Sequence, residues 1–311
     1  MDEHAKDRAL GLALVVAATA CWSTSGVFIN LIVAGSGITP TGLAFWRDLG
    51  TFLCLFGGLT ILKPELLRVK RRDLPWLMAM GAFSIGVFHV LWNTSVVAIG
   101  ASVATVIQSN APVIVAVLAW VFWREPLTWR KIAAIVLAAA GTALIYLIDQ
   151  EGAVNVTPSG LAIALTAAVG YASFSLFGKK LSGSYSSWTI LVYAFGMATL
   201  VLIPFALRSA APWQAPPRVI AYLAGLVLIP TLSGFALYTI ALGKLQASVA
   251  AITANTEILF ASVLAYFLLG ERLSIYQVIG ALLIVGAVVL VSLRGRRRTQ
   301  APLAAAEQSS P

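Results

Sequence analysis

The chain has 311 residues, of which 59% are hydrophobic and only 11% are charged, and its mean hydropathy is +0.90. Soluble domains carry about 25% charged residues, so this composition excludes a soluble globular protein and indicates a surface that faces lipid. The formal charge of +9 does not indicate nucleic-acid binding, because the basic residues fall at the ends of apolar segments and in a terminal run.

Ten apolar segments follow one another along the chain, and each is long enough to cross a hydrocarbon core of roughly 30 Å as a helix. Helices are expected because lipid cannot satisfy backbone polar groups. The first segment is too long for the apolar region of a signal peptide, so we predict an uncleaved span. The ten segments are 10–33, 42–62, 74–97, 101–123, 130–148, 159–179, 187–207, 217–241, 247–269 and 275–293.

The distribution of Lys and Arg predicts the orientation. With a cytoplasmic N-terminus, 17 of the 21 basic residues fall on the cytoplasmic side, three fall outside and Arg47 lies within a span. This asymmetry favours an even number of spans with both termini in the cytoplasm of a bacterial-type cell. Membrane lipids are then natural partners of the basic residues.

The chain also repeats itself. Residues 101–145 align with 247–291 without gaps: ASVA meets ASVA, Glu125 meets Glu271, and Trp92 upstream meets Tyr238. The repeat predicts two halves of five helices each. Because five is odd, the second half must be inverted relative to the first, an architecture that recurs in secondary transporters. The predicted parts are a cytoplasmic N-terminus (1–9), a first five-helix repeat (10–148), an external linker (149–158), a second inverted repeat (159–293) and a basic, disordered cytoplasmic tail (294–311).

Several motifs carry a resemblance to a known family. They are Ala44-Phe45-Trp46-Arg47 in the second helix, the joints Arg124-Glu125-Pro126-Leu127 and Gly270-Glu271-Arg272-Leu273, and the small-residue helix that follows each joint. With the repeat, they resemble the EamA-type branch of the drug/metabolite transporter superfamily. The resemblance implies a ten-helix exporter or exchanger of small metabolites, commonly amino acids. Ile258 departs from the family pattern, which often has proline after the equivalent of Glu257.

Polar groups within spans are costly, so they are candidates for a substrate site. His89, Trp92 and Asn93 share one face of the third helix. They either line a cavity for an amphipathic solute or form a packing seam; His89 alternatively carries protons, although no acidic residue is near it in sequence. Gln108 and Asn110 of the fourth helix, beside Pro112, either line a bend or hold helices together.

Charged and aromatic side chains complete the predicted site. Glu257 of the ninth helix, near Asn255, serves ion coupling or amine recognition, pairs with Arg47, or lies at the interface. Arg47 binds a substrate carboxylate, reaches the outer surface, or ties two helices together. Four aromatic residues line the cavity or pack around it, and three prolines are predicted hinges. The aromatics are Trp22, Tyr171, Tyr193 and Tyr238, and the prolines are Pro112, Pro204 and Pro230.

These residues favour an exporter of amino acids and related zwitterionic metabolites, because carriers of sugar phosphates or nucleotide sugars need several basic residues in mid-span. Efflux of lipophilic or cationic compounds stays open. No HExxH, GxSxG or Walker motif indicates an enzyme, and no ring of like charges indicates a channel. We expect no cofactor and no metal site; the sequence leaves the oligomeric state open, and a monomer fits it.

Overall fold

A computed structural model describes residues 3–114, 117, 129–147, 156–245, 250 and 253–292. Within these ranges the chain is helical and contains no strand. The predicted tail (294–311) and most of the predicted linker (149–158) lie outside the described residues. The α-helices are α1 (Glu3–Ser36), α2 (Pro40–Leu62), α3 (Leu74–Ala79), α4 (Phe88–Ile99), α5 (Ala101–Gln108), α7 (Trp129–Leu147), α8 (Pro158–Ser182), α9 (Ser187–Ala206), α10 (Pro217–Leu226), α11 (Phe235–Lys244), α13 (Thr256–Leu269) and α14 (Ile275–Ser292).

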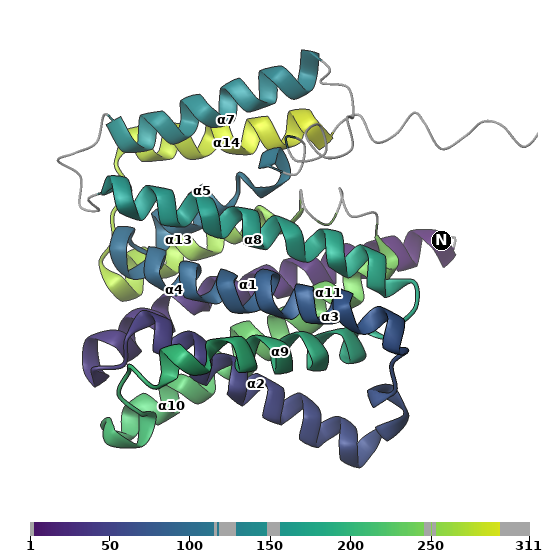
Figure 1. The fold of residues 1–311 in the computed structure, drawn as a ribbon. Coiled ribbons are helices and arrows are strands. Elements are labelled where there is room, and N and C mark those ends of the chain that lie inside the picture. Colours follow the sequence, from purple (N-terminus) through teal and green to yellow (C-terminus); the bar gives the residue numbers. More distant parts are fainter. Residues whose placement is uncertain are drawn as a thin grey trace, which may run out of the picture.

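Five helical stretches in the described chain are long and apolar enough to cross a membrane, and four shorter apolar helices accompany them. Together with the partly described segment that begins at Ala101, they coincide with the ten predicted spans. Figure 1 shows the start of α1 and the end of α14 at the same end of the bundle, as an even number of crossings requires. The all-α, ten-helix membrane fold is therefore confirmed.

Three helices begin at a hydroxyl residue whose side chain accepts a hydrogen bond from the backbone N–H three positions later. Thr39, Thr157 and Ser186 cap α2, α8 and α9 in this way, at 3.0, 3.1 and 3.2 Å. Proline follows at the first position of α2 and α8, where its missing N–H costs nothing. These local signals explain where α2, α8 and α9 begin.

A carboxylate from the other half of the chain caps α5. Glu271 accepts hydrogen bonds from the N–H groups of Ala101 and Ser102, at 2.9 and 3.0 Å, and from the Ser102 hydroxyl at 2.8 Å. Gly100 makes the sharp turn that exposes these donors, with a φ of 78°. The cap therefore joins the start of α5 to the joint between α13 and α14.

Replacing Glu271 with glutamine should destabilise the protein by about 1–3 kcal/mol, because the start of α5 loses a charged acceptor and one acceptor oxygen. The measurement is thermal unfolding of the purified protein in detergent. Glu65→Gln is the control, since the exposed Glu65 side chain makes no hydrogen bond within the described residues. Equal melting temperatures for the two variants would contradict the capping role.

The third and eighth predicted spans each contain a π-helical stretch. These stretches are η3 (Met80–Val87), between α3 and α4, and η5 (Val227–Gly234), between α10 and α11, and they start 147 residues apart. Pro230 lies within η5, as expected of a helix distortion, whereas η3 has no proline. In η3 a Cβ on Gly81 would stand 2.4 Å from the carbonyl oxygen of Ala194, so a glycine is required where this helix meets α9.

The fourth and ninth spans are interrupted at matching positions. The helix that begins at Ala101 breaks into a turn at Ser109–Asn110, just before Pro112, and the helix that contains Thr253 breaks at Asn255. The second break forms although Ile258 replaces the proline of the family pattern. Both halves of the chain therefore place a broken helix and a π-helical stretch in corresponding spans.

The fifth and tenth spans pair with each other. α7 packs against α14 along a small apolar cluster of Ala134, Ala138, Ala287 and Val288 with Val113, separate from the main core. Figure 1 shows this pair as a layer at one side of the bundle, next to α5 and α8. The remaining helices surround one large core, in which the polar residues described next are buried.

Candidate functional site

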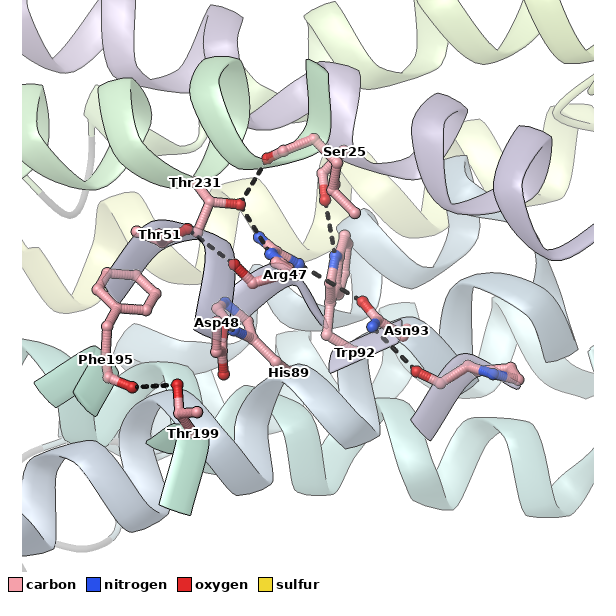
Figure 2. Close-up of polar contacts among 12 residues, drawn as sticks. Ser25, Arg47, Asp48, Thr51, His89, Trp92, Asn93, Phe195, Thr199 and Thr231 are labelled. Carbon is pink, nitrogen blue, oxygen red and sulfur yellow. Dashed lines mark hydrogen bonds and ion pairs between the residues drawn. The ribbon is translucent and has the colours of Figure 1, made fainter. Parts of the chain in front are cut away.

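Arg47 of α2 is buried at the centre of the bundle, with 2% of its surface exposed. Its Nε donates a hydrogen bond to the Thr231 hydroxyl at 2.8 Å, and its Nη1 donates to the Asn93 side-chain oxygen at 3.4 Å (Figure 2). Asn93 in turn donates to the carbonyl of Pro40 at 3.0 Å. Arg47 therefore links α2 to α4 and η5 and does not reach the surface.

The π-helical stretch η5 creates the acceptor for Arg47. Pro230 has no N–H, so the carbonyl of Leu226 loses its usual helical partner. The Thr231 hydroxyl donates to that carbonyl at 2.7 Å, and its oxygen accepts the bond from Arg47. The π-helical distortion at Pro230 therefore places the Thr231 hydroxyl where it can bind the buried guanidinium of Arg47.

Asp48 and His89 form a buried pair beside Arg47. His89 Nδ1 lies 2.6 Å from Asp48 Oδ1, both side chains are fully buried, and the imidazole packs between the rings of Phe195 and Phe235. Within the described residues, Asp48 Oδ2 and His89 Nε2 have no hydrogen-bond partner. The acidic partner that the sequence around His89 lacks is therefore supplied by α2.

A small cavity lies beside Arg47, between α1, α4, α8 and the broken fourth and ninth spans. Its volume is about 20 Å³, which has room for about one water molecule and is far below the roughly 300–1,000 Å³ of small-molecule sites. In this conformation the cavity is therefore too small to hold a small-molecule substrate. The cavity is lined by Trp22, Ser25, Arg47, Phe88, Trp92, Gln108, Tyr171, Phe235 and Glu257.

Aromatic rings form most of the cavity wall. The Trp22 ring meets Tyr171 and Phe235 edge to face, with centroids 6.0 and 5.4 Å apart, and Tyr238 behind it at 5.0 Å. Trp92 stacks on Phe88 and donates from Nε1 to the Ser25 hydroxyl at 3.4 Å. The wall therefore offers apolar faces with a few polar edges.

The two broken helices present polar side chains to this cavity. Gln108 precedes the first break, and its side-chain oxygen has no hydrogen-bond partner in the described chain; the same is true of Trp22 Nε1. Glu257 follows the second break, in the first turn of α13, where the helix dipole favours a carboxylate. Arg47 and Glu257 thus line one cavity, and no ion pair joins these two described residues.

Six of the predicted site residues line the cavity: Trp22, Arg47, Trp92, Gln108, Tyr171 and Glu257. The others lie around it or apart from it. His89 and Asn93 contact α2, Tyr238 packs behind Trp22, and Asn255 forms the break next to Glu257. Asn110 donates to Thr142 of α7 at 3.3 Å, and Tyr193 donates to the carbonyl of Leu67 at 2.6 Å, away from the cavity.

The predicted hinge prolines occupy different settings. Pro112 directly follows the break at Ser109–Asn110, Pro230 lies in η5, and Pro204 lies two residues before the end of α9. Their role as hinges stays a prediction. Sequence reasoning did not select Ser25, Asp48, Phe88, Thr231 or Phe235; of these, Phe88 and Phe235 directly follow the two π-helical stretches and could have been found from the repeat.

The close approach of α11 to Trp22 depends on Gly234, where a Cβ would stand 2.5 Å from Trp22 Cδ1. Gly234→Ala should therefore overpack the core around the indole and destabilise the protein by about 1–3 kcal/mol. Thermal unfolding of the purified protein in detergent measures the effect. Gly243→Ala is the matched control, since no atom lies within 4 Å of its Cβ position; equal losses in both variants would contradict this packing.

A bundle of apolar helices with polar side chains buried at its centre defines a multi-pass membrane protein. The chain belongs to the EamA-like transporter family, whose model matches residues 9–147 and again residues 158–293. The double match coincides with the two halves recognised from the repeat.

The relatives agree with this assignment. A probable terminal-alkyne amino-acid exporter of Streptantibioticus cattleyicolor is 29% identical over 89% of this chain and 92% of its own. An uncharacterized transporter of Archaeoglobus fulgidus is 29% identical over 73% of this chain and 81% of its own. A solved crystal structure superposes with a TM-score of 0.63 at 17% identity, over 93% of this chain and 99% of its own, and supports the fold alone.

Proposed function

We propose that the protein exports amino acids and related zwitterionic metabolites across the cytoplasmic membrane. The observation that carries this proposal is the placement of one buried cation, Arg47, and one buried carboxyl group, Glu257, on the wall of the same cavity. A zwitterion carries the complementary pair of charges. The terminal-alkyne amino-acid exporter among the relatives is consistent with such a substrate.

Each part of an amino acid has a counterpart in the cavity. The guanidinium of Arg47 has five N–H donors, and its hydrogen bonds to Thr231 and Asn93 leave others for a carboxylate. The carboxyl group of Glu257 receives the ammonium group, together with the free side-chain oxygen of Gln108. The side chain of the substrate then lies against Trp22, Trp92 and their aromatic neighbours.

Transport proceeds by alternating access. The central cavity lies between two halves that each contain a broken helix and a π-helical stretch, and such interruptions are where helices bend. We infer that the halves are inverted with respect to each other and rock about the cavity, with both termini in the cytoplasm. The 17-to-3 distribution of basic residues supports this orientation.

Efflux of lipophilic cations is the second candidate function. Glu257 and the aromatic wall favour it, because a buried carboxyl group and ring faces both attract cations. Arg47 disfavours it, since a buried guanidinium in the same cavity repels a cation that has no carboxylate. The two candidates therefore differ in their dependence on Arg47.

The test is counterflow exchange in liposomes, with a panel of labelled amino acids and a panel of lipophilic cations. We expect amino-acid exchange by the natural protein, its loss in Arg47→Gln, and unchanged exchange in Arg218→Gln, which removes an exposed arginine at one end of the bundle. Exchange of cations but of no amino acid, or full activity of Arg47→Gln, would overturn the proposal.

A further inference from the structure

A large apolar groove opens on the outer face of the bundle between α2 and α9, away from the central cavity. Its volume is about 540 Å³, and Phe52 and Phe56 of α2 face Met197 and Leu200 of α9 across it. Phe56 and Leu200 are 44% and 62% exposed, so the groove is open to its surroundings. In a membrane, these surroundings are hydrocarbon.

The shape of the groove follows from where α2 and α9 touch. A Cβ on Gly196 would stand 2.9 Å from the Phe52 ring, so the helices are close at this point. Beyond it, Figure 1 shows the second half of α2 diverging from α9. The segment after α2 then returns to α9, where the hydroxyls of Thr189 and Tyr193 donate to the carbonyls of Leu66 and Leu67 at 2.8 and 2.6 Å. The groove is therefore narrow where Phe52 meets Gly196, and this segment bounds it at the end that contains Leu67.

A polar pocket of about 430 Å³ adjoins the end of the groove that contains Leu67. It borders the groove at Leu66–Leu67 and at Thr189, one turn before Tyr193 on α9. Its wall is made by Glu65, Leu66, Arg68, Val69, Lys70, Ser184, Tyr185, Ser186 and Thr189. Tyr185 fixes this wall, because its hydroxyl donates to Asp73 at 2.7 Å and accepts from the Lys70 N–H at 3.1 Å.

The charge around this pocket is positive. Residues 63–73 contain five basic and two acidic side chains, Glu65 and Asp73, and residues 180–187 contain one lysine and no acid. Arg68, Lys70 and Arg71 are exposed, and Arg72, which is also exposed, lies 3.8 Å from the Asp73 carboxylate. The pocket and the groove together thus offer a cationic, hydroxyl-rich end and a long apolar end.

We propose that this composite site binds one anionic phospholipid of the surrounding bilayer. One of its two acyl chains occupies the groove between α2 and α9, and the phosphodiester group lies between Arg68 and Lys70 with the hydroxyls of Ser184 and Ser186 near it. A zwitterionic headgroup with a bulky cationic group, such as that of phosphatidylcholine, is a poorer ligand. The surplus of basic side chains repels its cationic group. The site is separate from the central cavity, so lipid binding does not depend on the proposed transport function.

The test is native mass spectrometry of the purified full chain, equilibrated with equal amounts of phosphatidylglycerol, phosphatidylethanolamine and phosphatidylcholine. We expect phosphatidylglycerol to be retained about tenfold over phosphatidylcholine, and this preference to vanish in the double variant R68Q/K70Q. All four basic residues that are changed in the variant and its control are exposed, so the folds should be unaffected. The matched control R208Q/R218Q removes two arginines outside residues 63–73 and should keep the preference.

Three results would overturn the proposal: equal retention of the three lipids, a preference that survives in R68Q/K70Q, or an equal loss in R208Q/R218Q. Soluble glycerol phosphate distinguishes the lipid from a free anion. It should not displace phosphatidylglycerol, because it has no acyl chain for the groove, and displacement at equal concentration would reassign the pocket to a soluble phosphate. Amino-acid exchange is measured separately, so its failure leaves this result standing.

Discussion

Arg47→Gln should lower amino-acid exchange about a hundredfold, because loss of one partner of a buried charge pair costs roughly 2–5 kcal/mol. The substrate carboxylate loses its cation, and Asp48 is left buried next to a neutral residue. The hydrogen bond from Nε to Thr231 is also lost, so the link between α2 and η5 weakens. Initial rates of counterflow in liposomes measure the effect.

The variant Arg47→Lys separates charge from geometry. Lysine keeps the positive charge but is a single point donor without the planar fork of arginine. We therefore expect an exchange rate that lies between the rates of the natural protein and of Arg47→Gln. The substrate concentration that gives the half-maximal rate should be higher than in the natural protein. Natural exchange rates in Arg47→Gln would show that Arg47 does not contact the substrate, and a lowered melting temperature alongside them would assign it to holding helices together.

Glu257→Gln should separate transport from stability. The carboxyl group is 6% exposed, so a neutral side chain of the same shape should leave the melting temperature equal or raise it. Exchange of amino acids should nevertheless fall about thirtyfold, since the substrate ammonium loses roughly 2 kcal/mol of charged hydrogen bonding. Thermal unfolding and counterflow of the same preparation give both quantities.

Glu271→Gln is the matched control for this prediction, and it should behave in the opposite way. Glu271 caps α5 and does not line the cavity, so its loss should lower the melting temperature while a folded sample keeps its exchange rate. Unchanged transport in Glu257→Gln would contradict the assignment of this residue to the substrate site.

The ten spans and the repeat could be predicted from the sequence because they depend on local composition. A span needs only about 20 apolar residues, and ASVA at 101 and 247 fixes the register of the halves. The broken fourth span was also indicated, by Pro112. By contrast, η3 has no proline to indicate its π-helical geometry, and the close approach of Gly81 to α9 appears only in the folded chain.

Part of the candidate site could also be predicted from local composition. Arg47, Trp92 and Glu257 are unusual residues within spans, so each was recognised alone. The pair of Asp48 and His89 was missed because its members are 41 residues apart and meet only when α2 packs on α4. Tyr193 was predicted at the cavity, but the face of α9 that it occupies turns toward Leu67, and a helical periodicity alone does not say which neighbour a face contacts.

Substrate protection of a single cysteine in the cavity tests the central claim most directly. Cys21 and Cys54 are replaced by serine, and Ser25, which lines the cavity, is replaced by cysteine. We predict that a transported amino acid slows thiol modification of residue 25 and leaves a cysteine at the exposed Ser184 unaffected. Modification at residue 25 that proceeds at the same rate with a saturating, transported amino acid would contradict the central cavity as the substrate site.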